Sequence, residues 1–154
     1  MRLSNNIAKT FTIAAVTAVA IAIAPTAKAD DKGCTNASLK GSFSHIATGF
    51  ITAPPTMAGP LAGVGTDTFD GNGGITSAAR LSINGNIVTL TATGTYQVNP
   101  DCTGTYTIAF QGGRTRLFFV IDDGGNEIQA LCTDPGVVLH HIFRRQFPAN
   151  DWRQ

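Results

Sequence analysis

The sequence predicts an all-β protein whose eight strands form an antiparallel up-and-down barrel after a cleaved signal peptide. Short runs of residues alternate between apolar and polar, which is the period of a half-buried strand. Glycine, asparagine, aspartate and proline separate these runs at short intervals, as in tight turns. In residues 63–75 an alternating run, a glycine-rich reversal and the start of the next run follow one another. Closing an eight-stranded meander into a barrel removes its two exposed edges.

Eight strands are expected, over residues 39–52, 61–69, 75–83, 87–98, 104–110, 114–121, 127–133 and 137–147. The first carries apolar and polar residues on both faces, so its inward face is left open. In the fourth, Thr89, Thr91, Thr93 and Thr95 form one face opposite Val88, Leu90, Ala92 and Tyr96. The apolar run of residues 117–121 in the sixth favours burial on both faces, or an outward face covered by something else.

The eighth strand has a more apolar face, which we expect to point inward: Val137, Leu139, His141, Phe143, Arg145 and Phe147. The longest loop is expected at residues 53–60, because proline cannot donate to a strand ladder. A two-sheet sandwich is the alternative fold, but its Greek-key topology needs a long crossover and the connections here are short. An eight-stranded barrel is either filled by side chains or holds one small ligand.

The N-terminus has the features of a secretory signal peptide. Arg2 and Lys9 accompany an uncharged run at residues 11–24, and an A-x-A site follows at residues 27–29. The run is short for a membrane span, which needs roughly 20 apolar residues. No lipobox leads into Cys34, which argues against a lipoprotein. The expected plan is a signal peptide (1–29), one barrel domain (30–147) and a C-terminal tail (148–154), exported to the periplasm or secreted.

The charge of the mature chain argues against a nucleic-acid partner. Removing Arg2, Lys9 and Lys28 from the 11 basic residues leaves 8 against 10 acidic ones, a net charge of −2. Such a balance gives no basic footprint for nucleic acid. The mature chain has no second long apolar run, so no membrane insertion is expected.

Three cysteines, Cys34, Cys102 and Cys132, remain in a chain expected to reach an oxidising compartment. The odd number leaves at least one thiol free or paired between chains. We favour a Cys34–Cys102 disulfide, because both residues lie beside turn residues at the edges of segments. Cys132 alternates with apolar residues in a strand and is expected to be a small buried side chain.

Several motifs in order resemble a group of small exported bacterial proteins. They are Cys34 followed by SLKGSF (residues 38–43), GTDTFDGNG (65–73), GTYQVNPDCTGT (94–105), and TDPG (133–136) with Arg145-Gln146 after it. This group resembles the calycin-like barrels of allene oxide cyclases and dirigent proteins. The resemblance covers nearly all of the mature chain and implies the same barrel, but no catalytic residue of those enzymes is matched. The group usually has small or polar residues where this chain has His140-His141-Ile142-Phe143.

The candidate site residues are polar and aromatic groups that could meet inside the barrel: His141, Arg145, His45, Phe43, Phe119 and Phe143. His141 can act as acid or base near neutral pH, and Arg145 can bind a carboxylate or enolate. The alternative for Arg145 is a place at the rim, reaching solvent or a turn aspartate. The aspartate-rich and glycine-rich stretches are predicted to be turns, because they lack the remaining ligands of a calcium loop.

No metal or cofactor is expected, since no phosphate-binding loop or zinc signature is present. The sequence therefore predicts a barrel that binds a small apolar or amphipathic molecule in its interior. Two alternatives stay open. One is a surface or structural interaction protein with a filled barrel, and the other is a cofactor-free cyclase or isomerase.

Overall fold

The computed structural model describes residues 33–147. The predicted signal peptide (1–29) and C-terminal tail (148–154) lie outside the described residues. Three single-turn 3-10 helices are present: η1 (Asn36–Leu39), η2 (Pro55–Met57) and η3 (Asp123–Gly125). The eight strands are β1 (Gly41–Ile51), β2 (Gly59–Phe69), β3 (Gly74–Ile83), β4 (Asn86–Val98), β5 (Thr103–Phe110), β6 (Gly113–Asp122), β7 (Glu127–Cys132) and β8 (Val137–Arg145). Within residues 33–147, no helix has the length and hydropathy needed to cross a membrane.

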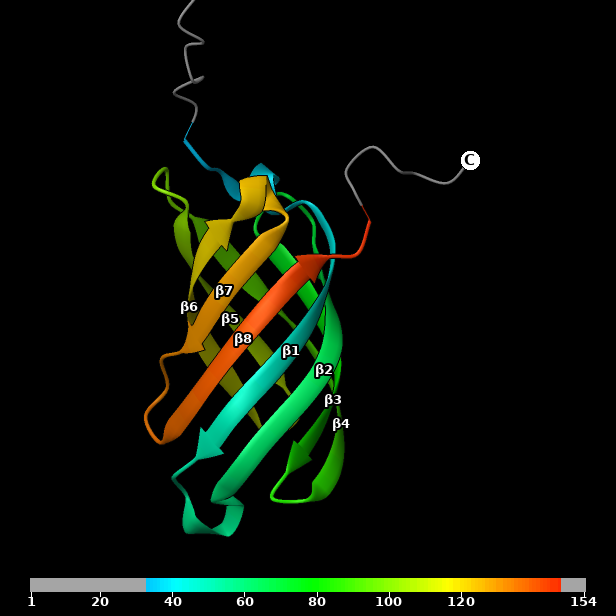
Figure 1. Ribbon diagram of the computed structural model, residues 1–154, viewed down its shortest axis with the longest axis vertical. Helices are drawn as coiled ribbons and strands as arrows, with labels where there is room; N and C mark the ends of the chain where they lie inside the picture. Colours follow the sequence, from blue (N-terminus) through cyan, green and yellow to red (C-terminus); the bar gives the residue numbers. More distant parts are fainter. Residues whose placement is uncertain (1–32, 148–154) are drawn as a thin grey trace, which may run out of the picture. The chain divides into compact units, whose positions relative to one another are not determined.

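The strands form a closed antiparallel barrel in sequence order (Figure 1). Each strand pairs with the next, and β8 returns to pair with β1. His45 lies opposite Gly65 on one side of β1 and opposite Phe143 on the other. The predicted up-and-down barrel is therefore confirmed, and the alternative sandwich is wrong.

The strand boundaries lie within two residues of those predicted. Differences of two residues occur at three strand ends, one of which is the start of β2 at Gly59. Leu39 belongs to η1 rather than to the first strand, and β8 ends at Arg145 rather than at Phe147. Gln146 and Phe147 form a bend, and Pro148, which cannot donate a ladder hydrogen bond, follows them in the sequence.

The Asp70 turn shows why the glycine-rich stretch is a hairpin. Oδ1 of Asp70 accepts hydrogen bonds from the backbone N–H groups of Asn72, Gly73 and Gly74, at 2.7, 3.0 and 2.8 Å. These bonds, led by that of Asn72, lower the pKa of the Asp70 carboxyl. The carboxylate thus holds the turn together through the backbone.

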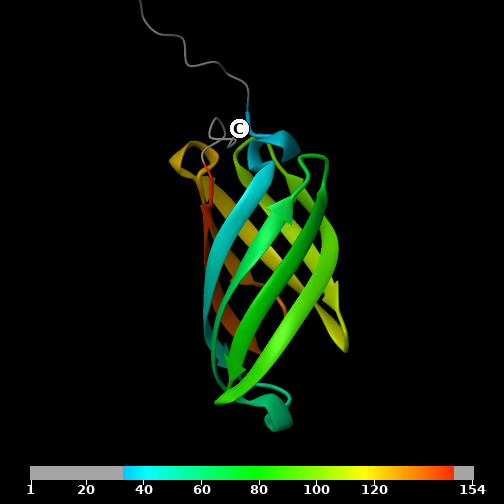
Figure 2. The same cartoon turned by 90° about the vertical axis from the view of Figure 1, so that its right-hand side faces the viewer.

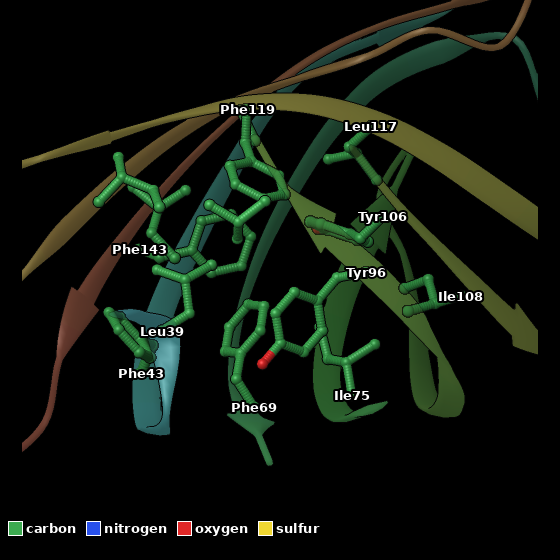
Figure 3. Close-up of a cluster of buried hydrophobic side chains, with 14 of the residues drawn as sticks. Leu39, Phe43, Phe69, Ile75, Tyr96, Tyr106, Ile108, Leu117, Phe119 and Phe143 are labelled. Carbon is green, nitrogen blue, oxygen red and sulfur yellow. The ribbon is translucent and has the colours of Figure 1, made fainter. Parts of the chain in front are cut away.

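The interior is lined by every second side chain of each strand. The largest fully buried side chains are Phe43, Phe69, Phe119, Phe143, Leu39, Leu117, Ile128 and Asp67. Many of the aromatic ones gather in a single cluster (Figure 3), where the Phe69 and Tyr96 rings meet edge to face at 5.0 Å. On β1, Phe43 and His45 point inward, whereas Ile46 and Phe50 point outward. This answers the question that the mixed faces of the first strand left open.

One end of the barrel is closed by a plug, which we define as residues 33–40 with η1 at its centre (Figure 2). Leu39 of the plug is buried among the core side chains. Oδ1 of Asn36 accepts a hydrogen bond from the Val98 N–H at 2.8 Å, and the Asn36 carbonyl accepts one from the Tyr96 hydroxyl at 3.0 Å. We call this end of the barrel the closed end.

The predicted disulfide attaches the plug to the barrel wall. Cys34 is bonded to Cys102, which lies in the turn between β4 and β5. The Cys34 N–H also donates to the Pro100 carbonyl at 3.1 Å. Cys132 is a free, buried thiol, as its place in an alternating run predicted.

The opposite end of the barrel lies beside η2, and we call it the open end (Figure 2). Here several inward positions of the strands are only partly buried: Leu81, Ile83, Leu90, Phe110, Thr115, Val137, Leu139 and His141. A smaller apolar cluster of Ala47, Ile51 and Leu61 packs at this end, apart from the main core. Solvent therefore reaches the inward positions from this side more readily than from the plugged side.

The outer wall has two different surfaces. The threonine face predicted for β4 is exposed, opposite the buried Ala92 and Tyr96. On β6, the outward side chains Phe118 and Val120 are 43% and 44% exposed. The apolar run of residues 117–121 is thus buried on one face only, and no described residue covers the other.

Candidate functional site: a polar cluster inside the barrel

Three titratable side chains meet in the apolar interior. His45 on β1, Asp67 on β2 and His141 on β8 form what we call the interior polar cluster. Each is placed there by strand alternation, since His45 follows Phe43, Asp67 precedes Phe69, and His141 precedes Phe143 on the inward face of its strand. The imidazole rings of His45 and His141 are 5.7 Å apart.

Asp67 and His45 form a close but poorly aligned pair. Nδ1 of His45 lies 3.4 Å from Oδ1 of Asp67, and the two residues are 7% and 1% exposed, respectively. The distance allows a charge interaction, but neither atom makes a hydrogen bond with another protein group. A buried carboxylate is costly unless it is paired and hydrogen-bonded. The pair therefore has unused hydrogen-bonding capacity in the interior.

His141 has no hydrogen-bond partner on either ring nitrogen. Both Nδ1 and Nε2 are shielded from solvent and unpartnered. Burial, and then the neighbouring His45, lower the pKa of His141 to about 4. The imidazole is therefore neutral at physiological pH, with one N–H donor and one acceptor nitrogen.

Aromatic and small side chains surround the polar cluster. The Phe143 ring stacks on His141 with an interplanar angle of 9° and a centroid distance of 5.7 Å. It also lies 5.2 Å from the His45 ring and 6.1 Å from Tyr106. Burial raises the pKa of the Tyr106 hydroxyl well above its usual value, with smaller contributions from Asp67 and Cys132. The cluster is thus a small polar group within an apolar, aromatic wall.

Gly65 leaves room for the His45 ring. A Cβ atom at this position would lie 2.8 Å from Cε1 of His45 and as close to the Cβ of Ala79. Any larger residue at position 65 therefore displaces the imidazole or the neighbouring strand.

Only part of the predicted residue set comes together. His45, His141 and Phe143 are in mutual ring contact. Phe43 and Phe119 are core residues, and Phe43 lies under Arg145 at the closed end, with the Arg145 guanidinium carbon 4.5 Å from its ring centroid.

Arg145 binds the plug through its own hydrogen bonds. Its Nη1 donates to the Lys40 carbonyl at 2.6 Å, and its Nη2 donates to the carbonyls of Ser38 and Gly125 at 3.1 and 2.8 Å. These bonds join the plug, β8 and η3. The arrangement is closer to the alternative predicted for Arg145, a place at the rim, although its partners are carbonyls and not a turn aspartate.

The substitution Arg145→Met is expected to lower the free energy of unfolding by about 2 kcal/mol, because three carbonyls lose a charged donor. Arg144→Met is the matched control. Arg144 pairs with Glu127 at 3.1 Å, but its side chain is 74% exposed, so its loss should cost less than about 0.5 kcal/mol. Urea denaturation of both variants measures the difference. Equal losses would show that the carbonyl contacts of Arg145 contribute little.

Asp67 is the site residue that the sequence analysis missed. A signal was present, because Gly65, Asp67 and Phe69 share one face of an alternating strand. The buried Phe69 places that whole face inward. The prediction for this stretch rests on its turn residues and assigns no inward face to the strand.

Two surface depressions lie away from the interior polar cluster. One of about 370 Å³ is beside the disulfide, lined by Cys34, Ser38, Cys102 and η3, and one of about 270 Å³ is on the wall of β2, β3 and β4. Neither includes a residue of the cluster. We take the cluster as the candidate site because, within residues 33–147, it alone combines apolar walls with buried polar side-chain atoms that make no hydrogen bond. Across the described residues, no three His, Cys, Asp or Glu side chains are grouped as metal ligands.

Comparisons with known proteins support the fold. No protein-family model and no curated protein matches the chain. A solved structure titled "Structure of a redesigned beta barrel, mFAP1, bound to DFHBI" is similar to it, with a TM-score of 0.51 and 15% sequence identity. The match covers 71% of this chain and 97% of that one. At this identity, the likeness shows a shared β-barrel architecture.

Proposed function

We propose that this protein is an exported small β-barrel that binds a small apolar or amphipathic molecule in its interior. The observation that carries the proposal is the interior polar cluster. Asp67 and His141 have buried polar atoms that make no hydrogen bond with the protein, and apolar side chains surround them. Ligand sites commonly combine apolar walls with a few polar groups that orient the ligand.

The two ends of the barrel support this proposal. The plug, its disulfide and Arg145 close one end. At the other end, several inward side chains are only partly buried, and His141 is among them. A ligand is therefore expected to enter from the open end and to place its polar group against His141. The structurally similar redesigned barrel, by its title, was solved with DFHBI bound, which is compatible with small-molecule binding by such a fold.

Export is the second part of the proposal. It is supported by the basic and apolar N-terminal pattern and by the A-x-A site at residues 27–29. The Cys34–Cys102 disulfide agrees with an oxidising compartment, either the periplasm or the medium.

The test is native mass spectrometry of the protein purified from its own host without detergent. We expect an extra mass that is lost on denaturation and recovered in the organic extract. Stripped protein should take the same mass back from that extract. His141→Phe should take up less of it, whereas His140→Phe, which changes the outward neighbour, should take up the same amount. A bare protein whose experimental structure has a completely filled interior contradicts the proposal.

A second candidate is a surface or structural interaction protein with a filled barrel. It is favoured by the apolar outer wall, where Phe118 is paired in register with Leu131, and Phe50 with Val138. All four side chains are exposed. Self-association in analytical ultracentrifugation that is lost in Phe50→Ser/Val138→Ser, together with a bare interior, supports this candidate over ligand binding.

A third candidate is a cofactor-free cyclase or isomerase, in line with the resemblance to allene oxide cyclases and dirigent proteins. It is favoured by the Asp67–His45 pair beside the neutral His141, which are groups able to accept and return a proton. If the bound molecule from the extract is slowly converted by the purified protein, Asp67→Asn should abolish the conversion. Unchanged turnover in that variant removes the candidate.

A further inference from the structure

We infer that the interior polar cluster selects an uncharged, hydroxyl-bearing aromatic ligand of the phenol class and rejects carboxylates. This inference rests on the proposed function, because it names the ligand chemistry of the same site. It follows from the charges that the interior contains, the hydrogen-bonding groups left free and the shape of the surrounding side chains.

The charge balance of the interior disfavours an anion. Asp67 is a buried carboxyl group, and its Oδ1 lies 3.4 Å from Nδ1 of His45. Among the residues that the structure describes, Arg145 is the one arginine or lysine at an inward strand position. Its donors are already bonded to the carbonyls of Lys40, Ser38 and Gly125 at the closed end. A ligand carboxylate would therefore lie near Asp67 with no free guanidinium or ammonium to offset it.

The side-chain groups of the cluster that make no hydrogen bond favour a ligand that can donate one. Oδ1 of Asp67 lies beside His45 but accepts no hydrogen bond, and the neutral His141 has one free acceptor nitrogen and one free N–H. A hydroxyl can donate to either acceptor and still accept from an N–H. A phenol is a stronger donor than an alkyl hydroxyl, and it stays uncharged at neutral pH.

The walls favour a flat, apolar body. Phe143 and His141 are already stacked, and the Tyr106 ring lies 6.1 Å from Phe143 at an angle of 83°. Such a set of faces and edges suits an added aromatic ring, which gains from stacked or edge-to-face contact. An aromatic hydroxyl compound therefore matches the walls and the polar cluster together.

Four probes with one skeleton test the inference at pH 7: para-cresol, para-toluate, para-methylbenzylamine and para-xylene. Binding is followed by NMR of the histidine side chains during titration of the full mature protein. We expect para-cresol to shift His45 and His141 but not the outward His140, and to bind about tenfold more tightly than para-xylene, as one hydrogen bond allows. Para-toluate should bind more weakly than para-xylene.

Variants distinguish binding that depends on a hydrogen bond to the ligand hydroxyl from binding that depends only on the size and shape of the ligand. His141→Phe should weaken para-cresol about tenfold, to the affinity of para-xylene, while para-xylene itself is little changed. His140→Phe should change neither. Asp67→Asn removes the negative charge at similar size and should raise the affinity of para-toluate towards that of para-xylene.

The outcomes distinguish this inference from the proposed function. Para-toluate or para-methylbenzylamine binding more tightly than para-cresol overturns the inferred ligand class, and so does equal binding of para-cresol and para-xylene. In each of these cases, shifts at His45 and His141 still support interior binding. Absence of interior shifts with all four probes overturns the inference, and the proposed function falls with it only if native mass spectrometry also finds the protein bare.

Discussion

Replacing Cys34 and Cys102 together by alanine is expected to lower the free energy of unfolding by about 4 kcal/mol. The disulfide joins residues 68 positions apart, and closing a loop of that size removes roughly this amount of chain entropy from the unfolded state. Because small domains are stable by about 5–15 kcal/mol, the loss is a large part of the total. The melting temperature should fall by roughly 15 °C.

Loss of the disulfide should also be measurable as faster hydrogen exchange in the plug. Without the disulfide, residues 33–40 stay attached through the hydrogen bonds of Asn36 and Arg145 and through the burial of Leu39. Hydrogen exchange should therefore rise first in η1 and at the Val98 amide, before the rest of β4. Calorimetry measures the first effect and hydrogen-exchange mass spectrometry the second.

Cys132→Ala is the control for the disulfide, because it removes the free thiol and leaves the Cys34–Cys102 bond in place. A reducing agent should destabilise the wild type and Cys132→Ala by the same amount, and it should not change the double variant. If reduction of the wild type shifts its stability by less than about 1 kcal/mol, the disulfide does not stabilise the fold as the chain-entropy argument requires.

Acidification from pH 6.5 to pH 4 is expected to cost about 3 kcal/mol of stability through His141 alone. The pKa of His141 is about 4 in the folded protein, against a usual value of 6.5. Above pH 6.5 the imidazole is neutral in both states and contributes no pH dependence. Between pH 6.5 and 4 the unfolded chain gains a proton that the folded protein does not, so stability falls. Below pH 4 both states are protonated and this loss levels off.

Two variants isolate the contribution of His141 from the other groups that titrate in this range. His141→Phe keeps a ring beside Phe143 and should show a shallower fall in stability between pH 6.5 and 4, by about 3 kcal/mol over the interval. His140→Gln, which lies on the outward face of β8, should retain most of the wild-type fall. An NMR titration that finds a pKa near 6 for His141 would show that its nitrogens are well solvated, contrary to their burial here.

Most of the architecture was predictable because alternation and turn residues are local signals. The Asp70 turn and the threonine face of β4 follow directly from their own sequences. Barrel closure followed from the number of strands and their short connections, which make an open sheet with two bare edges unfavourable. The disulfide was predicted because Cys34 and Cys102 stand beside turns, whereas Cys132 lies within a strand.

The site was less predictable because it depends on the strand register, which decides which inward side chains lie at the same height along the barrel axis. His141 and Phe143 were expected inside and His45 was a candidate for the interior, but only the register brings His45 opposite Phe143 and leaves Phe43 with Arg145. Asp67 required a face assignment for β2, which a one-residue slip would reverse. The role of Arg145 could not be found from local sequence, since its carbonyl partners Ser38 and Lys40 lie more than 100 residues away.

The pairing of β1 with β8 has a consequence for the order in which the molecule is made. Ser44 on β1 donates to the carbonyl of Arg144, 100 residues later, so the barrel cannot close until nearly the whole domain has been synthesised. Contacts of such long range form slowly, and the aromatic interior stays uncovered until they do. Because His141 and Phe143 belong to the closing strand, a chain that stops before β8 contains most of the core but lacks the site. The interior polar cluster is therefore assembled last, in the same event that shields the interior from water.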